Sequence, residues 1–334
     1  MAFSLAKTTL FGVLAAGLAV DASPSLKRTL WALAAFTTAT PVAERVKRDE
    51  CSTYRVVKDW CASDYLDAEL CLTQYPATMN LGGSKTYWDE IQYNHITQAD
   101  WAHFVGYEIP MHARTIQRTN GMRSYWNEES DASSLSDIKD STIFQSDAFG
   151  GNGTGVHECI ADGPFVNVTL AFQPGSSFFT NADTENNTCI YRDLSLSSLQ
   201  SSDFDECQQE SSFEDMWDCV ENGPHGNGHG AVGGLMGDVA NSPGDPVFFL
   251  HHHFIDLQWW KWQVRDLDAR LTEIGGTNGD SEGDAPASIA DYDGDNGSTT
   301  TLNHVLQMMD LYENVTVANV MSTNYTSVCL TYEY

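Results

Sequence analysis

The pattern of apolar and polar positions along this chain predicts helices joined by long loops. It marks five candidate helices: 49–75, 86–118, 213–220, 246–271 and 300–314. Pro110 predicts a break in the second of them, because proline lacks the amide hydrogen that an interior helical turn needs. The stretch that begins at Pro246 has the clearest helical pattern.

The segments between these stretches are predicted to be loops. Residues 131–210 are rich in Ser, Gly, Asn and Asp, and residues 275–298 are rich in Gly and Asp. The glycines of 224–237 argue against one regular helix through that segment. We find no internal repeat and no domain boundary within 49–334. The expected fold class is therefore mainly α, a helical bundle around one core with long loops.

The N-terminal segment is typical of a secretory signal. Lys7 precedes an apolar run from Leu10 to Val20, and small residues follow the run. The run is too short to span a membrane comfortably, although a signal anchor is the alternative. The dibasic pair at 47–48 resembles a processing site, unless it stays uncleaved. We therefore expect three segments: a signal peptide at 1–23, a propeptide at 24–48 and a mature domain at 49–334.

The cysteines and glycosylation motifs agree with export. The 8 cysteines are an even number and include no Cys-x-x-Cys pair, so we expect disulfides rather than a cysteine zinc site. A bridge between Cys51 and Cys329 is one hypothesis for the pairing. Six asparagines begin Asn-x-Ser/Thr motifs without an intervening proline: Asn152, Asn167, Asn186, Asn296, Asn314 and Asn324. Together these features predict a secreted, extracellular glycoprotein with disulfide-tied loops.

The charge balance excludes two classes of partner. The chain has 17 Lys and Arg against 46 Asp and Glu, a formal net charge of -29. Such an acidic surface repels nucleic acids and anionic membranes, so we expect neither as a partner. The acidic residues are spread among 9 Trp, 13 Tyr and 15 Phe, which is not the composition of a disordered acidic tail.

The placement of the histidines carries the chemical signal. Most of them fall into two groups far apart in the sequence: His95, His103 and His112, and then His225, His229, His251, His252 and His253. A lone histidine is more often a core or surface residue, so it is the combination that favours a metal. Imidazole suits copper, zinc, iron and nickel. Two imidazole trios without carboxylate or thiolate favour copper, while zinc is the main alternative for each group taken singly.

A long motif at residues 242–256 resembles the second copper signature of tyrosinases, catechol oxidases and molluscan hemocyanins. It reads Ser-Pro-Gly-Asp-Pro-Val-Phe-Phe-Leu-His-His-His-Phe-Ile-Asp, where the family has Asp-Pro, aromatics, Leu-His-His, three residues and Asp. The motif His225-Gly-Asn-Gly-His229 resembles the first half of the same site. The resemblance implies that His225, His229 and His252 bind one copper. His252 is preferred to its neighbours because it stands four residues before Asp256, as the family's ligand does.

A first copper site is similar to the family's but less complete. His103 and His112 are nine residues apart, as in the family, and the segment 110–114 reads Pro-Met-His-Ala-Arg where the family has Pro-Trp-His-Arg. His95 fits the third ligand of the short fungal members. The resemblance therefore implies two copper ions as cofactors, the first of them held by His95, His103 and His112.

Two departures from the family concern this first site. Residues 124–128 read Ser-Tyr-Trp-Asn-Glu instead of Pro-Tyr-Trp-Asp-Trp. The chain between His112 and Trp126 is also shorter than the family leads one to expect. Of the two sites, the first is therefore the one whose integrity a structure must test.

The resemblance also implies roles for three further residues. Glu221 matches the family glutamate that holds an active-site water, and Phe248 matches the aromatic that packs on a second-site histidine. Asp256, one helical turn after His252, is expected to orient that imidazole. The plain structural alternatives are a helix-end carboxylate for Glu221 and a surface ion-pair partner for Asp256.

The implied activity is the copper-dependent oxidation of o-diphenols to o-quinones, so the expected partners are a small phenolic substrate and O2. Gly226 and Gly230 follow the first two second-site histidines and provide no side chain to help deprotonate a phenol. We therefore expect o-diphenols, with o-aminophenols as a further candidate, ahead of monophenols. Residues 332–334, Tyr-Glu-Tyr, resemble the end of the family's central domain, which predicts a short form without the C-terminal lid domain.

Three alternative functions remain open. The chain could be a degenerate or half-occupied copper-binding protein, if its first site is incomplete. It could be a reversible O2 carrier like hemocyanin, which shares the copper site. It could also be a zinc hydrolase that uses only His225, His229 and His252. Copper stoichiometry and quinone formation from catechol distinguish these functions.

Overall fold

The structure, a computed structural model, describes residues 55–59, 63–115, 124–172, 189–279, 292–295, 297–324 and 329–333. All of these residues belong to one unit, which begins at Val42. The predicted signal peptide and propeptide lie outside the described residues, as do two of the cysteines and two of the glycosylation motifs. What the sequence predicts for those parts stays a prediction.

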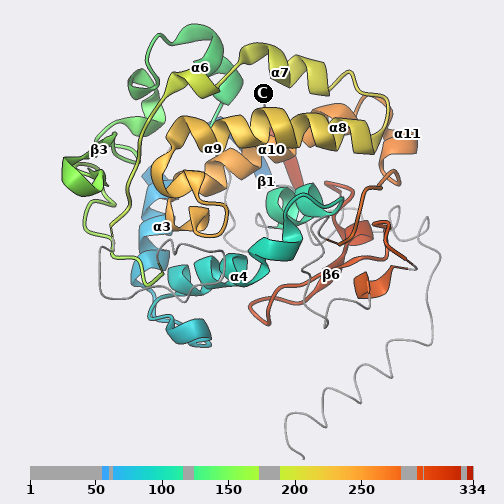
Figure 1. Ribbon diagram of the computed structural model, residues 1–334, viewed down its shortest axis with the longest axis horizontal. Helices are drawn as coiled ribbons and strands as arrows, with labels where there is room; N and C mark the ends of the chain where they lie inside the picture. Colours follow the sequence, from blue (N-terminus) through green and yellow to red (C-terminus); the bar gives the residue numbers. More distant parts are fainter. Residues whose placement is uncertain are drawn as a thin grey trace, which may run out of the picture. The chain divides into compact units, whose positions relative to one another are not determined.

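Helices dominate the described residues, which confirms the mainly α prediction. They are α3 (Ser63–Gln74), α4 (Tyr87–Ala102), α6 (Glu128–Ser134), α7 (Ser201–Cys207), α8 (Phe213–Val220), α9 (Gly226–Val232), α10 (Val247–Gln263) and α11 (Leu267–Arg270). Figure 1 shows α8 and α9 running end to end, with α7 above them and α4 below. The predicted helix at 213–220 corresponds to α8.

Helix α10 lies in the core because apolar side chains are spread around all of its sides. Nearly all of its side chains are buried, and they enter two clusters, one around Phe248 and one around Trp259. A helix that is hydrophobic all round is stable only when other elements cover it. The helix predicted at 246–271 is therefore present, although it ends at Gln263 and the separate short helix α11 follows.

Two buried ion pairs anchor α10. Arg192 donates a hydrogen bond of 2.7 Å from Nε to Asp245, just before the helix begins. Arg114 donates one of 2.8 Å from Nε to Asp256, within the helix. All four side chains are fully buried. Removing one partner of such a pair leaves an uncompensated buried charge, which costs about 3–5 kcal/mol.

A small parallel sheet joins the two ends of the described chain. Its strands are, in order, β2 (Ser124–Tyr125), β1 (Arg55–Asp59) and β7 (Leu330–Glu333). Arg55 pairs with Leu330, and Lys58 pairs with Ser124. Two antiparallel pairs also occur among the described residues: β3 (Gly153–Thr154) with β4 (Cys159–Ile160), and β5 (Val305–Leu306) with β6 (Val315–Thr316).

Two of the predicted helices are interrupted differently from expectation. The stretch 49–75 includes a strand, β1, and becomes helical only in α3. The stretch 86–118 breaks at His103, whose backbone is extended, and not at Pro110. Pro110 lies instead inside a short π-helical turn, η2 (Ile109–Thr115). The break leaves His103 and His112 on opposite sides of a loop.

The helix predicted at 300–314 is wrong. Met309 and Asp310 have positive φ angles of 48° and 64°, which a right-handed helix does not allow. The Asn314 side chain accepts a hydrogen bond of 2.8 Å from the Met308 N–H, which closes a loop at the same place. By contrast, the expectation that 224–237 is not one helix is confirmed, since α9 ends before Gly233 at φ 59°.

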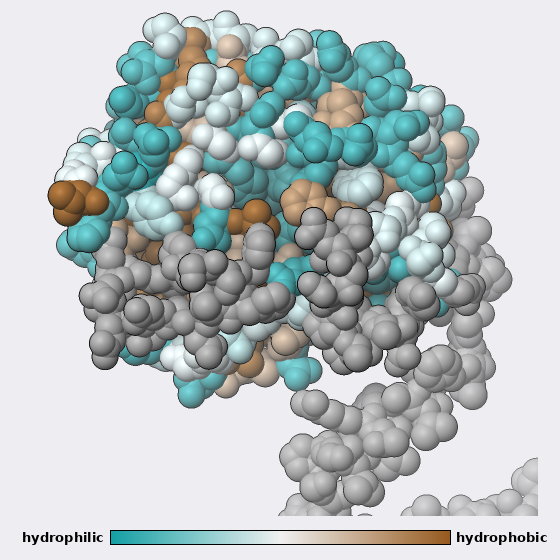
Figure 2. Space-filling model, in the orientation of Figure 1, coloured by the Kyte–Doolittle hydropathy of each residue, from teal (hydrophilic) through white to brown (hydrophobic). Residues whose placement is uncertain are grey.

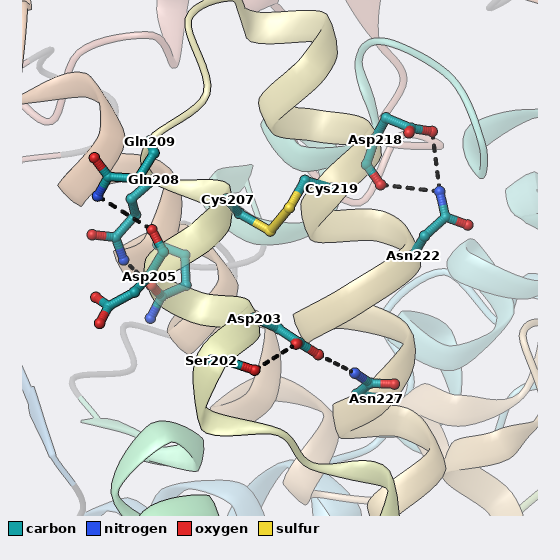
Figure 3. Close-up of a disulfide and its surroundings, with 11 residues drawn as sticks. Ser202, Asp203, Asp205, Cys207, Gln208, Gln209, Asp218, Cys219, Asn222 and Asn227 are labelled. Atoms are coloured by element: carbon teal, nitrogen blue, oxygen red, sulfur yellow. Dashed lines mark hydrogen bonds between the residues drawn. A yellow bond between two sulfur atoms is a disulfide. The ribbon is translucent and has the colours of Figure 1, made fainter.

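The described residues contain two complete disulfides, Cys159–Cys189 and Cys207–Cys219. Cys329 is also disulfide-bonded, to a partner outside the described residues, so its pairing with Cys51 stays a prediction. Figure 3 shows that Cys207–Cys219 ties α7 to α8. Asn227 adds a second tie by donating a hydrogen bond of 2.9 Å to Asp203, which joins α9 to α7 (Figure 3).

The face in Figure 2 is mainly hydrophilic, with small and separate hydrophobic areas. Among the described residues, no helix is both long enough and apolar enough to cross a membrane.

Candidate metal centre

The first histidine trio comes together at the end of α4. His95 lies within α4, His103 follows directly after it, and His112 lies in η2. The ring centroids are 5.1 Å apart for His95 and His103, 5.0 Å for His95 and His112, and 4.5 Å for His103 and His112. One ring nitrogen from each lies within 4.8 Å of the others, so the three can share one metal ion.

The second group contains four histidines rather than three. His225 ends a π-helical turn, η7 (Glu221–His225), His229 lies in α9, and His251 and His252 lie in α10. One ring nitrogen from each lies within 4.8 Å of the others. The sequence predicts His252 as the ligand from α10, whereas in the structure His251 also faces the group. His253 points elsewhere, and its Nδ1 donates a hydrogen bond of 2.7 Å to the Ser124 carbonyl.

The two groups are adjacent, and Phe248 packs against both. The rings of His112 and His252 are 5.7 Å apart. Phe248, expected to pack on a second-site histidine, has its ring 4.1 Å from His252 and 5.3 Å from His95. Two metal ions held by these groups would therefore be neighbours beside a buried aromatic ring.

The hydrogen bonds of the imidazoles leave nitrogens available for metal. In both groups, Nδ1 atoms donate to backbone carbonyls: His95 to Ala240 at 3.0 Å, His103 to Ala99 at 2.8 Å and His229 to Met236 at 2.7 Å. Such a bond fixes the tautomer and leaves the Nε2 lone pair free for a metal. The buried Nε2 atoms of His95, His251 and His252 have no hydrogen-bond partner in the described part of the chain. These orphaned nitrogens fit copper, which imidazole binds well.

Burial favours the neutral form of most of these imidazoles. It lowers the pKa of His95 to about 3 and the pKa of His103 to about 4. It also lowers the pKa of His112, His229 and His252 well below the usual value, and neighbouring histidines add to the effect. A metal must compete with protons for imidazole nitrogens, so neutral side chains are ready to bind it near neutral pH.

Two carboxyl groups face each other beside the histidines. Glu221 accepts a hydrogen bond of 2.7 Å from His225 Nδ1, and Glu108 lies within 4.8 Å of both. Burial raises the pKa of Glu108, and the facing Glu221 adds to this. Burial opposes ionisation of Glu221 too, but the contact with His225 outweighs it and lowers the pKa of Glu221. With His112 and His252, these groups line a cavity of about 10 Å³, close to the volume that one water needs.

The expected contact between Asp256 and His252 is not present. The Asp256 carboxylate is taken by Arg114, and it also accepts a hydrogen bond from the Tyr332 hydroxyl. Neither ring nitrogen of His252 has a hydrogen-bond partner among the residues that the structure describes. Asp256 therefore fastens α10 to η2, the turn that carries His112, and its expected role as the orienting group of His252 is corrected.

A buried glutamate holds His251 in place. Glu128 and His251 Nδ1 are hydrogen-bonded at 2.6 Å, and both side chains are fully buried. Burial raises the pKa of Glu128 well above its ordinary value. A Cβ on Gly228 would lie 2.3 Å from the His251 ring, so α9 can approach this pair only with a glycine there. The sequence shows that Glu128 stands where the family has Trp. It does not show that Glu128 binds His251, which lies 123 positions further along the chain.

Each group has one partly exposed histidine. His229 is only half-buried, and Gly226 and Gly230 on the same helix are exposed. The other trio adjoins a cavity of about 60 Å³, lined mainly by apolar side chains and by His95, His112 and Phe248.

Comparisons with known proteins agree with this site. A family model described as the common central domain of tyrosinase matches residues 85–265, which include both histidine groups. The tyrosinase-like protein phomQ1' of Diaporthe leptostromiformis is 27% identical over 324 residues, covering 85% of this chain and 81% of the relative. Tyrosinase ustQ of Aspergillus flavus is 26% identical over 318 residues, covering 84% and 80%.

A solved structure shows the same fold. The polyphenol oxidase from Thermothelomyces thermophila superposes with a TM-score of 0.70 and covers 93% of this chain and 94% of its own. The two sequences are 21% identical, so this likeness supports the fold and leaves the reaction to be argued from the site.

Proposed function

The chain belongs to the tyrosinase family, and we propose that it is a copper-dependent oxidase that converts o-diphenols to o-quinones with O2. The observation that carries this proposal is the pair of adjacent imidazole groups, each with ring nitrogens close enough to share an ion. In this proposal His95, His103 and His112 hold one copper, and His225, His229 and His252 hold the other.

The protein's own contribution is to hold and shield the metals. Backbone carbonyls fix the tautomers of His95, His103 and His229, which aims their other nitrogen at the ion. Phe248 and the surrounding core keep bulk water away from the first trio. When bound, two copper ions supply the electron exchange between catechol and O2, and two catechols oxidised per O2 yield two quinones and two waters.

Proton handling falls to Glu221 in this proposal. It lines the small cavity beside His225, His112 and His252. Its lowered pKa keeps it ionised at neutral pH, so that it can hold a water that accepts the phenolic proton. The hydrogen bond to His225 means that Glu221 also orients a proposed ligand.

The proposed substrates are o-diphenols, with o-aminophenols as a second candidate. Gly226 and Gly230 are exposed next to the half-buried His229, so an aromatic ring meets no bulky side chain there. Neither glycine offers a polar group that would assist the deprotonation of a monophenol.

Substituting Gly226 tests this preference. Gly226→Asn is expected to raise monophenol hydroxylation relative to catechol oxidation. An amide next to His225 can hydrogen-bond a water, and that water can then accept the proton of a monophenol. An added Cβ there lies 3.2 Å from the Glu221 carbonyl, a contact that a small shift relieves. Gly279→Asn is the matched control, since a Cβ there meets nothing within 4 Å. An unchanged activity ratio in Gly226→Asn contradicts the assignment.

The test of the function itself uses the copper-loaded full chain. We expect two coppers per chain and a quinone absorbance that grows on adding catechol in air. One copper per chain supports the half-occupied alternative. Two coppers with reversible O2 uptake but without quinone support the O2 carrier.

We also propose that the protein is exported and glycosylated. The signal-like N-terminus, the disulfides and the glycosylation motifs support this, and Asn167 and Asn314 are exposed. Deglycosylation of the secreted protein should lower its mass. Retention of the protein inside the expressing cell contradicts the proposal.

A further inference from the structure

The imidazole of His112 lacks the partner that most of its counterparts have. Its Nδ1 is buried and has no hydrogen-bond partner in the described part of the chain. By contrast, His95 and His103 in the same trio donate from Nδ1 to backbone carbonyls. A metal ligand whose second nitrogen is unsatisfied is poorly oriented, and buried unpaired polar atoms are rare enough to need an explanation.

A second orphaned atom faces it. Glu108 is buried with 1% exposure, and its Oε1 also has no hydrogen-bond partner among the described residues. This oxygen lies 3.9 Å from His112 Nδ1, one helical turn away in sequence. The two atoms are a complementary donor and acceptor about 1 Å beyond hydrogen-bond distance, so a small rotation of the imidazole joins them.

The other oxygen of Glu108 is already engaged. Oε2 accepts a hydrogen bond of 2.6 Å from the Phe104 N–H. Phe104 follows His103 directly and has a φ of 59°, an unfavourable conformation for a bulky residue. Glu108 thus holds the turn after one proposed ligand and faces the ring of another, and it also faces Glu221 of the second group.

From this geometry we propose that Glu108 is a positioning residue of the first metal site. Its Oε2 fixes the turn at Phe104, and its Oε1 is the acceptor that orients the His112 imidazole when the ion binds. The inference rests on the proposed function, because it takes His112 as a metal ligand. It adds a link between the two groups, since Glu108 and Glu221 lie together between His112 and His225.

Glu108→Gln separates the two contacts. The amide oxygen can still accept from the Phe104 N–H, but the amide NH2 then faces His112 and cannot accept its proton. If the only role of Glu108 were to accept the hydrogen bond from the Phe104 N–H, Glu108→Gln would bind metal with the affinity of the parent protein. Glu108→Ala removes both contacts and serves as the second variant.

The experiment measures copper affinity by chelator competition in a His229→Ala, His252→Ala double variant. His229→Ala alone would leave His225, His251 and His252 close enough to share an ion, whereas the double variant leaves the first trio as the intact site. We expect Glu108→Gln to weaken the remaining site by about 10- to 100-fold, the usual range for lost outer contacts of a ligand, with little change in thermal stability. The cobalt(II) absorption spectrum of the same site should shift, because the third imidazole is no longer fixed.

The matched control is Glu90→Gln. Glu90 is equally buried and accepts hydrogen bonds from the Thr78 and Met79 N–H groups, but none of its described contacts is a proposed ligand. Its substitution should leave the affinity unchanged.

Parental affinity in Glu108→Gln overturns the inference while leaving the proposed function intact. A His229→Ala, His252→Ala protein that binds no copper at all overturns both.

Discussion

The two histidine groups use the same side chains but rest on different supports. In the second group, His229 and His252 sit on α9 and α10, which pack together, and a disulfide ties the neighbouring α8 to α7. In the first group only His95 lies inside a long helix, while His103 and His112 flank a loop with a left-handed residue. The second site is therefore set by secondary structure, and the first depends on individual side-chain contacts.

Loss of ligands from either group should have the largest effect. His112→Ala, and the double variant His229→Ala, His252→Ala that leaves only two histidines in the second group, are each expected to lower copper from two per chain to one. Each should slow quinone formation by more than about 100-fold, beyond the effect of losing an outer contact. The copper left in His112→Ala should be held more tightly than the copper left in the double variant, because its site is better supported. Chelator competition measures both, and the reverse order would break the comparison.

Acid should destabilise the copper-free protein. This prediction tests the burial of the histidines, which is a property that the two groups share. His95 and His103 have pKa values of about 3 and about 4 in the folded protein because they are buried. In the unfolded chain the same side chains bind protons near pH 6.5. The unfolded state thus takes up more protons below pH 6.5, and stability falls from there toward pH 3–4.

Urea unfolding of the copper-free protein at pH 7.5, 6.5 and 5 measures this. Copper-loaded protein is the control, because bound metal occupies the imidazoles and favours the folded state. Equal stability at pH 7.5 and 5 without copper would show that the histidines are not buried as the structure has them.

The buried arginines offer a sharper comparison of the two sites. Arg114→Met and Arg192→Met each deprive a buried aspartate of its arginine, Asp256 within α10 and Asp245 just before it, so both should lower the free energy of unfolding by about 3–5 kcal/mol. Arg114 belongs to the turn that carries His112, whereas Arg192 contacts neither group. Only Arg114→Met should also weaken the first copper, as copper titration at low temperature would show. Equal affinity for the first copper in both variants would contradict the idea that Arg114 supports the first site and Arg192 does not.

The disulfide should have the smallest effect of this series. The Cys207→Ser, Cys219→Ser double variant opens a loop with a sequence separation of 12. The expected loss is about 3 kcal/mol, since a closed loop of that length limits the unfolded chain. Thermal unfolding measures it. If α8 supports the second site through this bond, copper at the second trio should weaken, and copper at the first should not.

The sequence predicts some of these residues well because their partners are local. His252 follows from its spacing to Asp256 in a helix that the apolar pattern also marks. The role of Asp256 does not follow, because its partner Arg114 comes from a turn 142 positions earlier. The contacts of Glu128 with His251 and of Glu108 with His112 likewise depend on how distant or irregular segments fold. The spacing of residues along the chain predicts which histidines lie together. The residues that hydrogen-bond to them and fix their orientation depend on tertiary contacts.

The sheet has a consequence for the order in which the molecule is completed. Every histidine of both groups is synthesised long before β7, the strand that pairs with β1. Tyr332 of β7 donates its hydroxyl to Asp256, and Asp256 holds Arg114 next to His112. During synthesis, the second group can assemble before β7 has been made, but the contacts that support Arg114 beside His112 are completed only after β7 pairs with β1. Metal offered early in the life of the chain should therefore enter the second trio first.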